Sequence, residues 1–209
     1  EEVSKRLTER DTAILRFVND CRIVTSDQIA RLFWRDCKNA DRLARRRLLQ
    51  LYKLHCIDRY YPQTSGGSAH QHVVLDTVGA KVLRLQPFRK ITKLPSNYHH
   101  TVMLTEWVLQ CHLNGLEPPE IGKKLTANLI PDAWHSSLRM AVEVDTGTEG
   151  LRVLANKARK YNRVDCTVVF ITSGSDNRIK YFASKMTRNI YGAPFSRIED
   201  LFKIILKRC

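Results

Sequence analysis

The stretch LIPDAWHSSLRMAVEVDTGTEG, Leu129 to Gly150, contains two short apolar runs that each end in carboxylates. The first run ends at Asp132, and the second ends at Glu143 and Asp145. If the runs pair as a hairpin, Asp132 and Glu143 meet near one end of a sheet, and Glu143 and Asp145 share a face because strand side chains alternate. Clustered carboxylates raise each other's pKa values unless a cation neutralises them. The pattern therefore indicates either turn and capping positions or a site for Mg²⁺ or Mn²⁺.

The sequence on either side of this hairpin alternates between helical and strand-like patterns. Helices are expected over 99–113 and 149–161, a strand over 165–172, and further elements over 177–186 and 198–207. The strand, DCTVVFIT, is a nearly continuous apolar run, which is typical of a strand buried on both faces. This order predicts an α/β sandwich for residues 98–209.

The preceding residues, 1–86, show helical patterns followed by strand-like ones. Thr8 and Thr25 can cap two helices, and Asn39 can cap a third that runs to about His55. Helix, helix, basic helix and hairpin is the order of a winged helix, a variant of the helix-turn-helix module. We therefore predict a winged-helix DNA-binding domain over residues 1–86, and an α/β fold, α+β overall, for the whole chain.

The predicted hairpin consists of β-prone runs over 56–61 and 71–75 on either side of a Gly-rich tip, Gln63–Ala69. A short helix over 78–85 closes the domain. Residues 87–97 hold two prolines, which suit neither a helix interior nor a central strand, and they are predicted to be a linker.

The third predicted helix carries the candidate DNA contacts. Arg42, Arg45 and Arg46 are three and four residues apart and share one face, whereas Leu48 and Leu51 lie on another. Such a helix can lie in a major groove while its apolar face stays anchored in the domain. A solvated charged face is the structural alternative. The full predicted DNA-binding set is Arg42, Arg45, Arg46, Arg47, Lys53 and Arg59.

The composition narrows the classes of partner. The net charge of +14, densest in residues 1–95, favours a polyanion, and nucleic acid is the usual one. The sequence contains no apolar run long enough to form a membrane segment. It also lacks the GxxxxGK[ST] motif of P-loop enzymes. The six cysteines are widely spaced without a CxxC pair, which indicates reduced thiols in a cytoplasmic protein.

Asp132 after Pro131, with Glu143 at strand spacing in an α-β-β-α-β order, resembles the PD-(D/E)xK nuclease superfamily. The resemblance implies a nuclease-like domain over 98–209, with Asp132 and Glu143 holding Mg²⁺ or Mn²⁺ if the site is active. The superfamily keeps a lysine two residues after the glutamate, where this chain has Asp145. Some members supply that lysine from the following helix. The candidate catalytic set is Asp132, Glu143, Asp145, Lys157 and Lys160.

Over most of its length the chain is similar to the replication-relaxation family of bacterial plasmids and integrative elements. The phrases that carry this similarity are LTERD from Leu7, RLLQLY from Arg47, IPDA from Ile130 and EVDTGTE from Glu143. The resemblance implies a DNA-binding protein that acts in plasmid replication or conjugative transfer. The alternative is a metal-dependent DNA nuclease or nickase, and the sequence leaves enzymatic activity open. The implied partners are double-stranded DNA and either a relaxase or replication proteins. A homodimer is left open, and no association with a membrane is expected.

Overall fold

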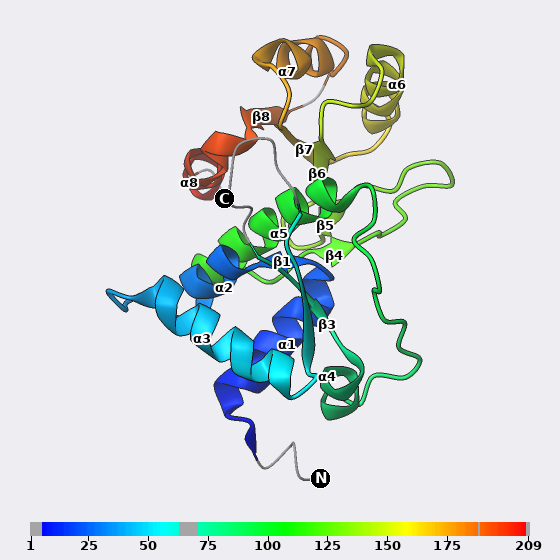
Figure 1. Ribbon diagram of the computed structural model, residues 1–209. Helices are drawn as coiled ribbons and strands as arrows, with labels where there is room; N and C mark the ends of the chain where they lie inside the picture. The colour runs from blue at the N-terminus through cyan, green and yellow to red at the C-terminus, as the bar shows by residue number, and fades with distance from the viewer. Residues whose placement is uncertain (1–5, 63–70, 188, 208–209) are drawn as a thin grey trace. The chain divides into compact units, whose positions relative to one another are not determined.

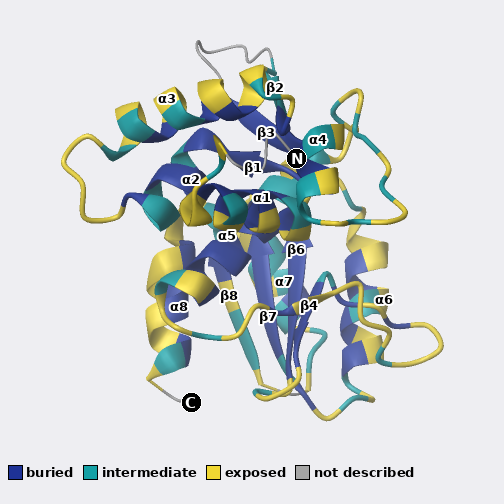
Figure 2. Ribbon diagram, turned by 90° about the horizontal axis from the view of Figure 1, so that it is seen from below, coloured by how far each residue is buried: buried dark blue, intermediate teal, exposed yellow. Residues whose placement is uncertain are grey.

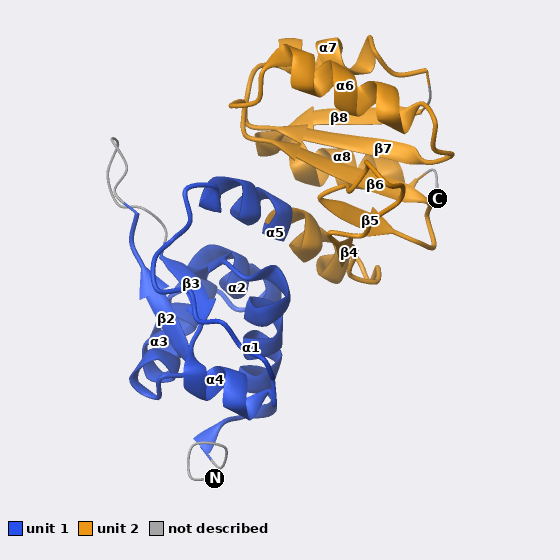
Figure 3. Ribbon diagram, turned by 90° about the vertical axis from the view of Figure 1, so that its right-hand side faces the viewer, with its two compact units in different colours: residues 1–105 blue, residues 106–209 orange. Residues whose placement is uncertain are grey.

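The computed structural model describes residues 6–62, 71–187 and 189–207. The chain divides into two compact units, residues 1–105 and 106–209 (Figure 3). Each unit combines helices with one β-sheet, so the predicted mixed α/β class is confirmed. Residues 87–97 fall in the first unit, and the predicted boundaries on either side of them stay a prediction. Within the described ranges no helix is both long and apolar enough to cross a membrane.

The described residues of the first unit contain the helices α1 (Glu9–Cys21), α2 (Ser26–Phe33), α3 (Ala40–Lys53) and α4 (Thr77–Val82) (Figure 1). The predicted caps of α1 and α2 are confirmed, because Thr8 and Thr25 each accept a hydrogen bond from the backbone three residues on. In turn, the side chains of Asp11 and Gln28 accept hydrogen bonds from the backbone N–H groups of Thr8 and Thr25, which completes two capping boxes. Asn39 stands at the N-cap of α3 without a side-chain cap bond.

The sheet of the first unit has three antiparallel strands in the order β1-β3-β2: β1 (Val24–Thr25), β2 (Ile57–Tyr60) and β3 (His72–Leu75). The two strands of the predicted hairpin are therefore present and paired. The predicted tip, Gln63–Ala69, lies outside the described residues. The two-residue β1 was not expected from the sequence, since so short a strand leaves no alternating pattern.

The second unit contains a five-stranded sheet in the order β4-β5-β6-β7-β8. The strands are β4 (Glu120–Ile121), β5 (Ala133–His135), β6 (Met140–Asp145), β7 (Thr167–Thr172) and β8 (Ile190–Pro194). The first three pair antiparallel, as the predicted hairpin requires, and β6, β7 and β8 run parallel. The central pair is almost wholly buried, as the dark ribbons of β6 and β7 show (Figure 2).

Helices cover both faces of this sheet (Figure 3). On one face lie α6 (Leu151–Tyr161) and α7 (Asp176–Ala183), and there Phe170 of β7 stacks on Phe182 with ring centroids 4.3 Å apart. On the other face lie α8 (Ile198–Leu206) and the second half of α5 (Tyr98–Leu113), joined by contact of Trp107 with Phe202. The result is an α/β/α sandwich whose β6 carries two of the predicted carboxylates, Glu143 and Asp145.

Candidate functional site

The exposed face of α3 carries the three arginines predicted to contact DNA. Arg42, Arg45 and Arg46 are all exposed, while Leu48 and Leu51 on the opposite face are fully buried. This burial fixes the helix in the unit and leaves the guanidinium groups free to reach a partner. The arginine face is therefore an exposed basic surface on a packed helix.

Arg45 makes an ion pair within α3. Its Nη2 lies 2.5 Å from Asp41 Oδ2, and the two side chains are 63% and 57% exposed. An exposed pair one helical turn apart contributes little to stability, on the order of 0.3–0.5 kcal/mol. A stronger anion can therefore displace Asp41 at small cost.

The C-terminal end of α3 adds two further basic groups. Lys53 is the last helical residue and is exposed. The Arg59 guanidinium of β2 lies over the Tyr52 ring, with Cζ 4.2 Å from the ring centroid. This cation–π contact orients Arg59 beside the end of α3.

Arg47 differs from the other predicted DNA contacts because it binds a buried carboxylate. Its Nε donates to Asp11 Oδ1 at 2.5 Å and its Nη2 donates to Asp11 Oδ2, while Asp11 is 1% exposed. Burial raises the pKa of Asp11, but hydrogen bonds from Arg47 and Thr8 outweigh it and leave that pKa below its usual value. Arg47 thus joins α3 to α1.

The carboxylates of the second unit meet at the end of the β5–β6 hairpin. The strand register pairs Ala133 with Val142, so the next residues along, Asp132 and Glu143, lie opposite each other. The half-buried Asp132 accepts a hydrogen bond through Oδ2 from the Val144 backbone N–H, at 2.8 Å. This bond joins the two chain segments just beyond the last paired residues of β5 and β6.

Glu143 is the most deeply buried of these carboxylates, at 1% exposure. Lys157 Nζ donates to its Oε2 at 2.8 Å, and the Tyr161 hydroxyl donates to its Oε1. Burial and the neighbouring Asp132 raise the pKa of Glu143 to about 7, against the opposing effect of Lys157. Both donors come from α6, whose inner face packs on β6.

Lys157 also connects Glu143 to Glu149. Its Nζ lies 3.4 Å from Glu149 Oε1. Burial alone would lower the pKa of Lys157, but the carboxylates of Glu143, Asp132 and Glu149 raise it well above the usual value. The lysine therefore stays charged. Lys160, the other candidate, is exposed on α6 and makes no ion pair within the described part of the chain.

Asp145, 2% exposed, is held separately from Glu143. Arg178 of α7 donates to both of its oxygens, from Nε to Oδ2 at 2.6 Å and from Nη2 to Oδ1 at 2.9 Å. The Thr172 hydroxyl donates to Oδ2 at 2.9 Å, and the Gly147 N–H to Oδ1 at 3.0 Å. Burial raises the pKa of Asp145, but the donors, Arg178 foremost, outweigh it and lower that pKa below its usual value.

These donors bear on whether the carboxylates fit a divalent metal. Both oxygens of Glu143 and both oxygens of Asp145 already accept protein hydrogen bonds, several of them from cations. Within residues 6–62, 71–187 and 189–207, no three His, Cys, Asp or Glu side chains are grouped as a metal site would require. Mg²⁺ or Mn²⁺ would have to displace Lys157 and Arg178, so the residues as arranged do not fit such an ion.

Three residues of this cluster were not anticipated from the sequence. Tyr161 lies four residues after Lys157, so helical spacing could have placed it on the same face. The sequence predicts Glu149 only as the start of a helix, and that helix begins at Leu151. Arg178 is 33 residues from Asp145 and meets it only because β6 and β7 run parallel, which no local pattern indicates.

The pKa of Glu143 predicts how stability depends on pH. An unfolded glutamate releases its proton near pH 4.5, whereas native Glu143 holds its proton to about pH 7, so the native state binds more protons in between. Stability therefore falls as pH rises through this window, by up to about 3 kcal/mol. We expect the unfolding free energy of the Glu143→Gln variant to lack this decline in urea titrations from pH 4.5 to 7.5. If the unfolding free energies of the native protein and of Glu143→Gln changed with pH in the same way, the prediction would be wrong.

The comparisons with known proteins agree with the resemblance noted from the sequence. The family model described as replication-relaxation matches residues 15–169, which is most of the chain and reaches from α1 into β7. No curated protein and no solved structure matches the chain significantly. The matched span includes the arginine face of α3 and the carboxylates of the β5–β6 hairpin. The chain therefore belongs to the replication-relaxation family.

Proposed function

We propose that this protein binds double-stranded DNA through α3 and acts in the replication or transfer of a plasmid or other mobile element. Family membership points to replication. The observation that carries DNA binding is the exposed face of Arg42, Arg45 and Arg46 on a helix whose other face is fully buried. A cytoplasmic location follows from this proposed role.

The order of elements in the first unit supports a winged helix. Helix α1, strand β1, helices α2 and α3, and the β2–β3 hairpin follow one another along the chain. In this module the third helix enters the major groove, where an arginine can bind guanine O6 and N7 through two hydrogen bonds. Lys53 and Arg59 at the end of α3 are then placed to contact phosphates. We leave Arg47 out of the proposed contact because Asp11 engages it.

Binding to a duplex of about 30 base pairs should weaken steeply with salt. If the three arginines, Lys53 and Arg59 neutralise about four phosphates between them, the logarithm of the binding constant should fall by about 3.6 per tenfold rise in salt. Fluorescence anisotropy from 50 to 300 mM salt measures this slope, and a selection from random duplexes measures sequence preference. If the binding constant hardly changed with salt concentration, the proposal would be wrong.

For the second unit we propose a nuclease-like domain that recruits a partner, such as a relaxase or replication protein, or a second copy of the chain. The alternative, a metal-dependent nuclease or nickase, draws on the meeting of Asp132, Glu143 and Lys157. The partners already bound to Glu143 and Asp145 favour a site that has lost catalysis. The ion pairs of Glu143 with Lys157 and of Asp145 with Arg178 already reduce the repulsion between the carboxylates, which in an active site a metal ion would do.

A plasmid-nicking assay separates these alternatives. Supercoiled plasmid incubated with the full chain and Mg²⁺ or Mn²⁺ should yield no more nicked product than the Glu143→Ala variant does. The Arg159→Ala variant is the matched control, because this arginine is exposed on the same helix. Nicking that disappears in Glu143→Ala and persists in Arg159→Ala would establish the nuclease instead.

A further inference from the structure

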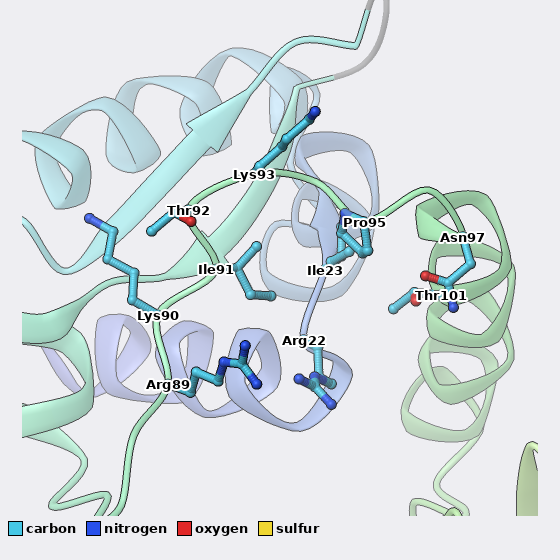
Figure 4. Close-up of a pocket in the computed structure, with 10 residues that line it drawn as sticks. All are labelled: Arg22, Ile23, Arg89, Lys90, Ile91, Thr92, Lys93, Pro95, Asn97 and Thr101. Atoms are coloured by element: carbon cyan, nitrogen blue, oxygen red, sulfur yellow. The ribbon is translucent and has the colours of Figure 1, made fainter.

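A basic hollow of about 370 Å³ lies within the first unit, away from the residues considered so far (Figure 4). Its walls come from the turn after α1, from residues 89–95 and from the first turn of α5. The lining residues include Arg22, Arg89, Lys90 and Lys93 and no acidic side chain. This volume suits a small ligand, and the charge suits an anion.

Residues 89–95 are fixed in place by contacts with β2 and with the cap of α4. Lys90 Nζ lies 3.0 Å from Asp58 Oδ2 and 2.9 Å from Asp76 Oδ1. The Tyr60 hydroxyl donates to the Ile91 carbonyl at 2.9 Å. The hollow is therefore formed before any ligand arrives, and the charge of Lys90 is already neutralised by its own partners.

Arg22 and Arg89 remain as the pair of cations that faces the hollow. Both line it, and the Arg89 side chain extends toward Arg22, while Lys90 and Lys93 point away (Figure 4). Both arginines are exposed, and neither has an acidic partner within the described part of the chain. An anion held between two guanidinium groups would be attracted by both of them.

The backbone at Arg22 is held in a conformation that few residues with a side chain adopt. Its φ is 67°, and the Ile23 N–H donates to the Cys21 carbonyl at 2.8 Å, which closes a three-residue turn. Buried Ile23 and a hydrogen bond from Thr105 Oγ1 to the Ile23 carbonyl, at 2.9 Å, keep the turn in place. A glycine would relieve the strain, yet this position carries an arginine that lines the hollow.

We propose that the hollow is a phosphate-binding site in which Arg22 and Arg89 clamp one phosphate group. The planar donor forks of two arginines match the oxygens of a phosphate. Thr92, Asn97 and Thr101 add hydroxyl and amide donors to the lining, and the positive end of the α5 dipole favours the same ligand. The phosphate belongs either to a free phosphorylated compound or to the backbone of bound DNA, and the second source rests on the proposed function.

The test uses the full chain and two probes: pyrophosphate, measured by isothermal titration calorimetry, and a duplex of about 30 base pairs, measured by anisotropy. The variant is Arg22→Gln with Arg89→Gln. The control is Lys81→Gln with Arg84→Gln, which removes two exposed charges from the same unit outside the hollow. Circular dichroism checks folding, and Arg89→Gln alone replaces the double variant if Arg22→Gln unfolds the chain.

A loss of tenfold or more in pyrophosphate affinity, relative to the control, assigns the site to a free phosphorylated ligand. Unchanged or absent pyrophosphate binding, with weaker DNA binding and a salt slope reduced by about one, assigns it to a DNA phosphate. Equal behaviour of variant and control with both probes overturns the proposal. The pyrophosphate result does not depend on α3, so it stands even if the chain fails to bind DNA.

Discussion

Replacing Arg42, Arg45 and Arg46 together by glutamine should weaken binding to the preferred duplex about 100- to 1000-fold near 0.1 M salt. Each arginine that binds a base contributes about 1–3 kcal/mol, and each one that binds a phosphate adds about one unit to the salt slope. Three such losses sum to about 3–4 kcal/mol if one or two arginines read bases, which corresponds to the expected fold-change. Anisotropy titrations at several salt concentrations give both the affinity and the slope.

Folding should be unaffected by this change, because the three side chains are exposed and α3 is anchored by buried Leu48 and Leu51. A matched control replaces three exposed arginines of the second unit, Arg152, Arg159 and Arg163, by glutamine. It removes the same charge, so it measures the nonspecific electrostatic contribution. Equal losses in the two triple variants would show that α3 does not read the DNA.

Removing Arg178 should cost the second unit about 3–5 kcal/mol of unfolding free energy, the range measured for breaking buried ion pairs. In Arg178→Met, Asp145 stays buried and keeps only Thr172 and Gly147 as donors. The aliphatic part of the Arg178 side chain also packs closely against Gly174, where an added Cβ would lie 2.5 Å from Arg178 Cδ. Urea unfolding followed by intrinsic fluorescence at pH 7 measures the loss.

The pH dependence of that loss tests its cause. In the native protein the pKa of Asp145 is lowered, so its contribution is present above the unfolded pKa of about 3.8 and disappears as pH falls through the native value. Without Arg178, Asp145 can be buried as the neutral acid, and the difference between variant and native protein should shrink toward pH 4. Arg178→Lys should fall between the two, since lysine lacks the two-pronged donor geometry. A loss that is constant with pH would point to packing alone.

Local patterns predicted a large part of the fold and less of the site. Thr8 and Thr25 were recognisable caps because the side chain that completes each box stands three residues away. Strand β7 was visible as an apolar β-branched run. In contrast, β8 (IYGAP) contains Gly192 and Pro194, residues that weaken strand propensity, and it forms only by pairing with β7 at the sheet edge.

The site shows the same division between local and long-range information. The placement of Asp132 opposite Glu143 could be predicted, because it depends only on the pairing of β5 with β6 in one hairpin. The sequence offered Lys157 and Lys160 equally, because residues three apart lie on nearly the same helical face. Packing on β6 selected Lys157. Arg178 could not be foreseen, because its contact with Asp145 depends on the order of strands rather than on spacing.

The Arg47–Asp11 pair sets a condition on the proposed binding of α3 to DNA. Because this pair ties the helix to α1, α3 cannot swing or roll to follow a distorted groove without exposing a buried charge. Little conformational entropy is then lost on association, which favours a tight complex with a matching site. In the proposed complex the same rigidity would keep the protein from accommodating a wrong base pair. The DNA would have to bend instead, and the stiffness of the target sequence would become part of what is recognised.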